Sequence, residues 1–160
     1  MVTRTATCGC GRVHVPVDDE PTLIAACHCD FCQKRTGSAF GYQAYFSQDQ
    51  CVEIVGETKV YDGLEVDGVE SQAGREQTPR YPFCTTCGST VYWTVGDGAD
   101  HALIAIAVGN LVDQDFPPPM REYYSSMRHR WVCAAFDAEQ FQTFPGGQER
   151  FRGFGGEQVR

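Results

Sequence analysis

Residues 27–32 read Cys-His-Cys-Asp-Phe-Cys, which places three thiols within six residues. Two more clusters, CGCG at 8–11 and CTTCG at 84–88, carry four further cysteines, and the chain has nine in all. An odd number excludes a complete set of intramolecular disulfides. The chain starts without the apolar segment of a secretion signal, and clustered thiols in such a chain indicate metal binding or catalysis in a reducing compartment. We therefore expect a cytoplasmic protein.

The clusters at 8–11 and 84–88 together predict a closed metal site. A Cys-x-x-Cys-Gly knuckle places two sulfurs on one side of a tight turn, and its glycine allows the positive φ that directs backbone N–H groups at the thiolates. The Cys-Gly-Cys pair supplies two more sulfurs. Thiolates of Cys8, Cys10, Cys84 and Cys87 fill a zinc tetrahedron, so this site is expected to be structural and to stabilise the fold.

The stretch at 27–32 predicts a metal site of a different kind. Cys27, Cys29 and Cys32 fill three corners of a tetrahedron, and no clustered cysteine remains for the fourth. Three protein ligands with one open position are typical of catalytic zinc. Other side chains could close the site and make it structural, and these are His14, His28, His101, His129, Cys51 and Cys133.

Most of these alternatives have a simpler interpretation. His28 lies between two ligands, so its side chain is expected to point away from the metal. His14 alternates with valines and is expected to be the solvent-facing residue of a strand. Cys51 and Cys133 lie in apolar stretches, CVEIV and WVCAAF, and are expected in the core.

A zinc ion on three thiolates favours sulfur chemistry. The thiolates give the site a negative charge and make the metal a weaker Lewis acid than zinc on three histidines, which disfavours activation of water. A small thiol suits such a soft site because it loses its proton on coordination. The site therefore predicts that a carbon–sulfur bond of a small thiol is formed or cleaved.

Short apolar runs separated by Gly, Pro and Asp predict a mainly β fold in one domain of residues 1–144. The expected strands are 11–15, 23–26, 38–46, 51–55, 90–95 and 102–108, and the expected short helices are 30–36 and 120–126. Residues 16–21 are expected to form a turn and 62–79 a hairpin excursion or mobile loop. Residues 145–160, which contain Gly and Arg, are expected to form a C-terminal tail.

The charge excludes some classes of partner. With 13 Lys and Arg against 21 Asp and Glu, the chain has a net charge of −8, which argues against a nucleic-acid-binding or polybasic membrane surface. No apolar run approaches the roughly 20 residues that span a bilayer. A small-molecule partner is therefore expected, rather than a nucleic acid or a membrane.

Three stretches, CGCG at 8–11, CHCDFCQKRTGSAF at 27–40 and FCTTCGS at 83–89, resemble the glutathione-dependent formaldehyde-activating enzyme family, which includes centromere protein V-like proteins. AVGNLVD at 107–113, the prolines at 117–119 and Arg130-Trp131 agree with its downstream pattern, so the resemblance covers residues 7 to about 144. It implies an Mss4-like fold of mostly antiparallel β-sheets with short helices. It also implies a structural zinc on Cys8, Cys10, Cys84 and Cys87 and a catalytic zinc on Cys27, Cys29 and Cys32.

The prototype activity implied by the resemblance is a carbon–sulfur lyase reaction, in which glutathione adds to formaldehyde to give S-hydroxymethylglutathione. Lys34 and Arg35 are candidates for binding a glutathione carboxylate, and the Ser38 hydroxyl is a further candidate contact. Trp131 is interpreted as a core anchor. Two other classes remain open, a non-catalytic interaction protein that uses zinc only for folding and a redox or metal-storage protein with exchanging thiols.

Overall fold

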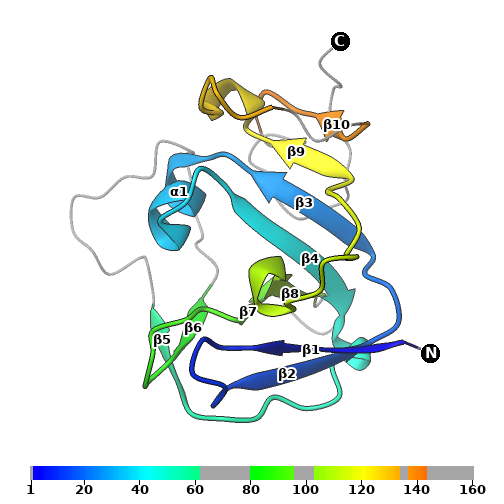
Figure 1. Cartoon of the computed structure of the whole chain (residues 1–160), viewed down its shortest axis with the longest axis vertical. Helices are drawn as coiled ribbons and strands as arrows, with labels where there is room; N and C mark the ends of the chain where they lie inside the picture. Colours follow the sequence, from blue (N-terminus) through cyan, green and yellow to red (C-terminus); the bar gives the residue numbers. More distant parts are fainter. Residues whose placement is uncertain (1, 62–79, 96–102, 134–136, 144–160) are drawn as a thin grey trace. The chain divides into compact units, whose positions relative to one another are not determined.

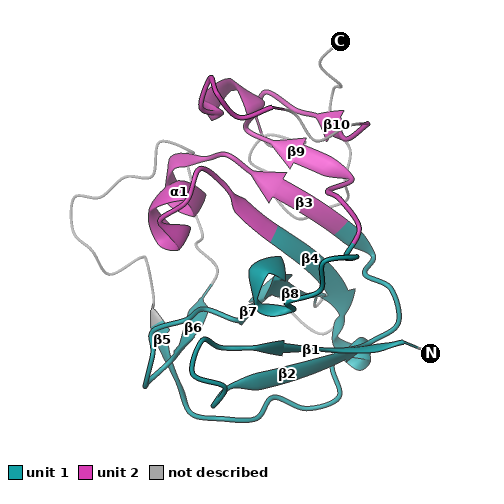
Figure 2. Cartoon of the chain, viewed as in Figure 1, with its two compact units in different colours: residues 1–23, 43–66, 78–116 teal, residues 24–42, 67–77, 117–160 magenta. Residues whose placement is uncertain are grey.

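The computed structural model describes residues 2–61, 80–95, 103–133 and 137–143 of the chain. Their elements are ten β-strands, one α-helix and three 3-10 helices, which confirms the predicted mainly β fold. The chain divides into two compact units (Figure 2): unit 1 comprises residues 1–23, 43–66 and 78–116, and unit 2 residues 24–42, 67–77 and 117–160. The expectations for 62–79, 145–160 and His101 lie outside the described residues.

Unit 1 begins with a β-hairpin. Strands β1 (Thr3–Thr7) and β2 (His14–Asp18) pair antiparallel (Figure 1). Val13, Val15 and Val17 are completely buried, because alternate side chains of an extended chain point to the same face. This one-sided burial gives the hairpin its core.

Two further groups of strands belong to unit 1. β5 (Thr58–Tyr61) and β6 (Tyr81–Cys84) pair antiparallel. β4 (Gly41–Ser47), most of which lies in this unit, pairs antiparallel with β8 (Leu103–Ala107), and β8 pairs antiparallel with β7 (Tyr92–Val95). The 3-10 helices η1 (Gln48–Gln50) and η2 (Val108–Asn110) follow β4 and β8. The core side chains of these strands include Phe46, Trp93, Ile104 and Ile106.

Unit 2 contains the α-helix and a sheet of short strands. β3 (Leu23–Cys27), β9 (Arg121–Tyr123) and β10 (Glu139–Gln140) follow one another in the order β3-β9-β10 (Figure 1). α1 (Asp30–Thr36) follows β3, and the 3-10 helix η3 (Ser125–Met127) follows β9. All five side chains of β3 are buried, as expected for its continuous apolar run.

Unit 2 contains parallel strand pairs, which are exceptions to the expected mostly antiparallel sheets. β9 runs parallel to both β3 and β10, with Cys27 opposite Tyr123. Parallel partners need a long crossover rather than a hairpin, and the chain reaches β9 only after passing through unit 1. Local sequence pattern does not specify the direction in which a distant strand arrives.

The N-terminal hairpin differs from the prediction at its turn. β2 continues through Pro16, where the turn at 16–21 was expected to begin, and Pro16 lies opposite Thr5. Proline has no N–H to donate, but its carbonyl accepts a hydrogen bond from Val52 N at 3.3 Å. The chain turns later, at Asp19, whose φ is 61°.

Two other element predictions are wrong and five are confirmed. Residues 120–126 form β9 and η3 rather than an α-helix, because pairing with β3 extends the chain. Residues 51–55 form only two isolated bridges, Val17–Cys51 and His14–Val55. The strands expected at 23–26, 38–46, 90–95 and 102–108 correspond to β3, β4, β7 and β8, and the helix expected at 30–36 is α1.

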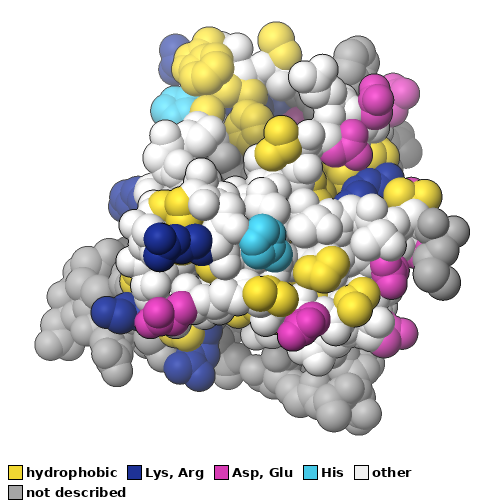
Figure 3. Space-filling view, turned by 60° about the horizontal axis from the view of Figure 1, so that its bottom comes forward, with side chains coloured by type: hydrophobic (Ala, Val, Ile, Leu, Met, Phe, Trp, Pro, Cys, Tyr) yellow, Lys and Arg dark blue, Asp and Glu magenta, His cyan; other side chains and the backbone are white. Residues whose placement is uncertain are grey.

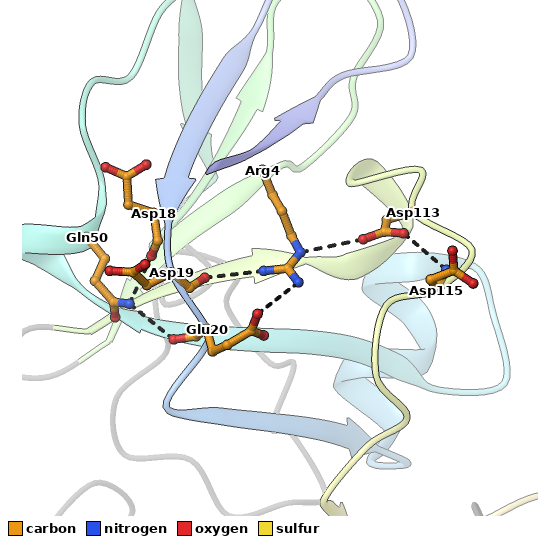
Figure 4. A network of polar contacts seen from close by, with 7 residues as sticks. All are labelled: Arg4, Asp18, Asp19, Glu20, Gln50, Asp113 and Asp115. Atoms are coloured by element: carbon orange, nitrogen blue, oxygen red, sulfur yellow. Dashed lines mark hydrogen bonds and ion pairs between the residues drawn. The ribbon is translucent and has the colours of Figure 1, made fainter. Parts of the chain in front are cut away.

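A polar network around Arg4 stabilises the hairpin of unit 1 (Figure 4). The Arg4 guanidinium lies 3.1 Å from a Glu20 carboxylate oxygen and 3.5 Å from one of Asp113, and it donates to the Asp19 carbonyl at 3.3 Å. Its Cζ also lies 5.4 Å from the centre of the Phe116 ring. These contacts tie β1 to the turn after β2 and to the segment after η2.

Some apolar and thiol side chains lie at the surface, against expectation. Trp131 is 75% exposed and is therefore not a core anchor. Cys133 is exposed and Cys51 half-buried, so neither belongs to the core. On the face drawn in Figure 3, apolar side chains are interspersed with basic and acidic ones. Within the described part of the chain, no helix is both long and apolar enough to cross a membrane.

Candidate metal centres

Unit 1 brings the four predicted sulfurs of its cysteine clusters together. The Sγ atoms of Cys8, Cys10, Cys84 and Cys87 all lie within 4.8 Å of one another. Cys8 Sγ lies 3.5 Å from Cys10 Sγ, which lies 3.7 Å from Cys84 Sγ. Cys8 follows β1 and Cys84 ends β6, so the cluster connects two strand pairs of the unit.

The two turns have the geometry expected of metal-binding knuckles. Gly11 and Gly88 have φ values of 72° and 75°, a conformation that glycine adopts at no steric cost. The amides of these glycines donate to the carbonyls of Cys8 and Cys84 at 2.8 and 2.9 Å. Val13 N donates to Cys8 Sγ at 3.2 Å, so a backbone N–H points at a sulfur as predicted.

Ser89 is a contact that the sequence analysis missed. Its Oγ lies 3.3 Å from Cys87 Sγ and accepts a hydrogen bond from Gly9 N at 3.2 Å, so it links the two knuckles. The hydrogen bond from the Ser89 side chain is the main cause that lowers the pKa of Cys87 to about 5. The position of Ser89 directly after the Cys-x-x-Cys-Gly motif is the sequence feature from which this contact could have been predicted.

Unit 2 gathers the other three thiols at the start of α1. Cys27 ends β3, Cys29 caps the helix by accepting from Cys32 N at 3.4 Å, and Cys32 lies in the first turn. Cys27 Sγ and Cys29 Sγ are 3.5 Å apart, and the three residues are 5%, 0% and 4% exposed. The neighbouring thiols and burial raise the pKa of Cys27 well above its ordinary value. A bound cation would offset this cost of forming thiolates.

The donor sets of both clusters fit zinc. A Zn–S bond of about 2.3 Å places neighbouring sulfurs of a tetrahedron about 3.8 Å apart, close to the separations found in both clusters. A disulfide would need sulfurs about 2.05 Å apart, and all these cysteines are free thiols. Among the described residues, no fourth His, Cys, Asp or Glu joins Cys27, Cys29 and Cys32.

His28 does not join the three-cysteine cluster, as expected from its place between two of the thiols. It is 1% exposed, and its ring centre lies 5.5 Å from that of Phe40. Its Nε2 lies 3.5 Å from Glu122 Oε2. Burial lowers the pKa of His28, and the Glu122 carboxylate opposes this shift.

Glu122 and Arg128 form a buried ion pair that the sequence analysis did not identify. Arg128 Nη1 donates to Glu122 Oε2 at 2.8 Å and to Gln140 Oε1 at 3.2 Å. The side chains of Glu122 and Arg128 are 3% and 25% exposed. With His28 they connect the segment 121–128 to the loop that carries the three cysteines.

The predicted substrate contacts lie on the helix or just after it. Lys34 and Arg35 occupy the last turn of α1, whereas Cys32 lies in the first. The Lys34 side chain is 74% exposed and pairs with Asp30 at 3.4 Å. Arg35 is half-buried, and Ser38 is exposed. A role of these three residues in substrate binding stays a prediction.

Gln33 makes a further connection that sequence reasoning missed. Its Nε2 donates to the carbonyl of His28 at 2.7 Å and to that of Met127 at 3.2 Å. Its Oε1 lies 3.1 Å from His129 Nε2. The His129 ring stacks on Trp131, with 6.0 Å between ring centres and 23° between planes. The Gln33 amide therefore connects segment 127–131 to the cysteine loop, in addition to the contacts of Arg128 through Glu122.

Comparison with known proteins identifies the family. Residues 3–127 match the family model described as glutathione-dependent formaldehyde-activating enzyme. No curated protein matches. Among solved structures, the chain is similar to a Rhodobacter sphaeroides protein determined as a structural genomics target, with 18% identity and a TM-score of 0.46 over 68% of this chain and 87% of that one. Because the family match includes both cysteine clusters, the chain belongs to the glutathione-dependent formaldehyde-activating enzyme family.

Proposed function

We propose that this protein is a zinc-dependent enzyme of the carbon–sulfur lyase type, which acts on an adduct of glutathione or another small thiol. The prototype reaction is the formation of S-hydroxymethylglutathione from glutathione and formaldehyde. The observation that carries the proposal is the difference between the two clusters. Four thiols meet in unit 1, whereas three buried thiols meet in unit 2 without a fourth candidate ligand among the described residues.

In this proposal, Cys8, Cys10, Cys84 and Cys87 hold a structural zinc, and Cys27, Cys29 and Cys32 hold a catalytic one. Zinc in the second site would supply a position where a thiol is held as a thiolate at neutral pH. The three cysteines themselves are almost completely buried.

The chemistry needs no oxidant or reductant. The substrate sulfur forms a bond to the carbonyl carbon of the aldehyde, and the carbon–oxygen double bond becomes a single bond. The thiol proton is transferred to the oxygen, which becomes a hydroxyl group. The reverse reaction cleaves the same carbon–sulfur bond. The protein therefore has to orient two small molecules and provide a path for one proton.

The proposal is tested by metal content and turnover measured on the same samples. The wild-type chain is expected to bind two zinc ions. It is also expected to form S-hydroxymethylglutathione from glutathione and formaldehyde, and NMR detects this product. Cys29→Ser is expected to abolish turnover and to retain the zinc of unit 1. Cys133→Ser is the matched control, because Cys133 is exposed and belongs to neither cluster.

Other results would contradict the proposal. One zinc per chain, or a Cys29→Ser variant with unchanged turnover, would exclude the catalytic site. If cobalt spectra showed four protein ligands at both sites, the protein would instead be an interaction protein that uses metal only for folding. Circular dichroism of Cys29→Ser separates loss of chemistry from loss of fold.

A further inference from the structure

The backbone of His28, between Cys27 and Cys29, is held by hydrogen bonds from two sides. Its N–H donates to the Tyr123 carbonyl of β9 at 2.9 Å. Its carbonyl accepts a hydrogen bond from Gln33 Nε2 in α1 at 2.7 Å. The N–H belongs to the planar peptide that carries the Cα atom of Cys27, and the carbonyl belongs to the one that carries the Cα atom of Cys29. The two hydrogen bonds therefore fix how the flanking thiols are oriented.

The hydrogen bonds of Gln33 determine the orientation of its amide group. Its Nε2 also lies 3.2 Å from the Met127 carbonyl, and backbone carbonyls can only accept. The NH2 group must therefore face the carbonyls of His28 and Met127, and it donates one hydrogen to each. The amide oxygen is then directed towards His129 Nε2, at 3.1 Å. Both amide hydrogens of Gln33 thus serve to hold the three-cysteine loop to segment 127–131.

The backbone of Gln33 is bound to the same loop. Gln33 N donates to the Cys29 carbonyl at 3.0 Å, and Cys32 N donates to Cys29 Sγ at 3.4 Å. Gln33 directly follows Cys32 in α1, so its side chain starts next to the third thiol. A substitution of this side chain leaves all three Sγ donors in the chain and removes only hydrogen bonds that support them.

We propose that Gln33 is a positioning residue of the three-cysteine site: its amide holds the loop in the conformation in which the three Sγ atoms can bind one metal ion. This proposal rests on the assignment of zinc to Cys27, Cys29 and Cys32 in the proposed function. Three buried thiolates repel one another, so a loop that already gathers their sulfurs lowers the cost of binding the ion. Loss of the Gln33 amide should weaken metal binding at this site alone.

The test compares Gln33→Met with Gln50→Met, because methionine is similar in length and lacks a hydrogen-bond donor. Gln50 makes contacts of the same kind in unit 1. Its Nε2 donates to the carbonyls of Asp18 and Glu20 at 2.9 and 3.1 Å, and its Oε1 accepts from Ser47 N at 2.9 Å. Both glutamines are half-buried. Gln50→Met therefore removes equivalent hydrogen bonds without touching the three-cysteine loop.

Zinc affinity is measured separately for the two sites. A chelator sets the free zinc concentration, and the backbone amide NMR signals of Cys29 and Gly88 report the occupancy of the three-cysteine and four-cysteine sites. Gln33→Met should weaken zinc binding at the three-cysteine site by about 10–100-fold, the usual effect of removing a group that orients metal ligands. Zinc binding at the four-cysteine site should stay at the wild-type value. Gln50→Met should leave the three-cysteine site unchanged.

Two further measurements separate positioning from general stability. Metal binding is coupled to folding, so any loss of stability in unit 2 would also weaken binding. Ser125→Ala removes a hydrogen bond of 3.0 Å to the Phe141 carbonyl, in unit 2 but outside the loop, and should keep the wild-type affinity. The absorption bands of cobalt-loaded protein depend on coordination geometry. They should shift in Gln33→Met and stay unchanged in Ser125→Ala.

The outcomes distinguish this proposal from the proposed function. If the wild-type chain binds two metal ions and Gln33→Met keeps its zinc affinity and cobalt spectrum, the role of Gln33 is overturned and the function stands. An equal loss of affinity in Ser125→Ala would overturn it as well. Absence of turnover with both ions bound would refute the lyase activity but not the role of Gln33, which metal binding alone measures. A wild-type chain with zinc only in the four-cysteine site would refute both.

Discussion

The buried carboxylate of Glu122 should make unit 2 strongly dependent on Arg128. The Glu122 side chain is 3% exposed, and its Oε2 lies 2.8 Å from Arg128 Nη1 and 3.5 Å from His28 Nε2. Arg128→Met keeps much of the aliphatic side chain but leaves the carboxylate without its cation. Removing one partner of a buried ion pair costs about 3–5 kcal/mol. Because Arg128 is itself 25% exposed, water can replace part of the interaction, and we expect about 3 kcal/mol.

The assay is urea unfolding of the zinc-loaded protein at pH 7 and one fixed free zinc concentration, because bound metal adds to the measured stability. Glu122→Gln alone should cost about 1 kcal/mol, since the amide keeps the shape and one acceptor. The double variant Glu122→Gln/Arg128→Met should be more stable than Arg128→Met, because the uncompensated charge is gone. The reasoning is refuted if Arg128→Met costs less than about 1 kcal/mol, or if the double variant is no more stable than Arg128→Met.

Three further predictions concern unit 1. Arg4→Met removes two ion pairs from a side chain that is 16% exposed and should lower the free energy of unfolding by about 1–2 kcal/mol in urea. Gly56→Ala places a Cβ 2.2 Å from the Arg12 carbonyl oxygen at a φ of +107°, so thermal unfolding should show a loss of about 2–4 kcal/mol. Ser89→Ala removes the main cause that lowers the pKa of Cys87 from 9.0 to about 5, so alkylation of Cys87 at pH 6 in metal-free protein, followed by mass spectrometry, should slow. Between pH 5 and pH 9, the folded state binds fewer protons at Cys87 than the unfolded state. The free energy of unfolding of the metal-free protein should therefore rise with pH across this range. Below pH 5 the stabilisation that comes from the Cys87 thiolate should be lost.

Each of these predictions has a contradicting result. Equal stability of Arg4→Met and the wild-type chain would mean that solvent replaces the network of Figure 4 at no cost. A stable Gly56→Ala variant would show that the chain at Arg12 moves aside easily. An unchanged alkylation rate in Ser89→Ala would show that the backbone, rather than the hydroxyl, stabilises the Cys87 thiolate.

The local features of the metal centres were predictable from sequence. A knuckle brings its two sulfurs together within a few residues, so spacing alone predicts the pairs in 84–88 and 27–32. The helix at 30–36 and the apolar strand at 23–26 were equally local, because capping and hydrophobic runs act over neighbouring residues. These parts of the prediction are confirmed.

The contacts around the three-cysteine loop were not predictable in this way. Gln33 and His129 are 96 positions apart, and an amide or an imidazole in a sequence does not indicate its partner. The interpretation of Trp131 failed for a related reason. A large aromatic residue favours burial only on average, whereas its 75% exposure depends on where segment 127–131 is attached.

The sequence by itself therefore determined which atoms can bind metal, how they divide into sets of four and three, and the mainly β character of the chain. It could do so because ligand chemistry and strand pattern depend on residue type and short spacing. Only the tertiary structure decided the parallel direction of β9, the burial of Glu122 against Arg128 and His28, and the orientation of the Gln33 amide towards His129. Each of these features arises from packing between segments far apart in the chain. The interaction free energy of such a contact depends on both residues together, so neither residue alone predicts it.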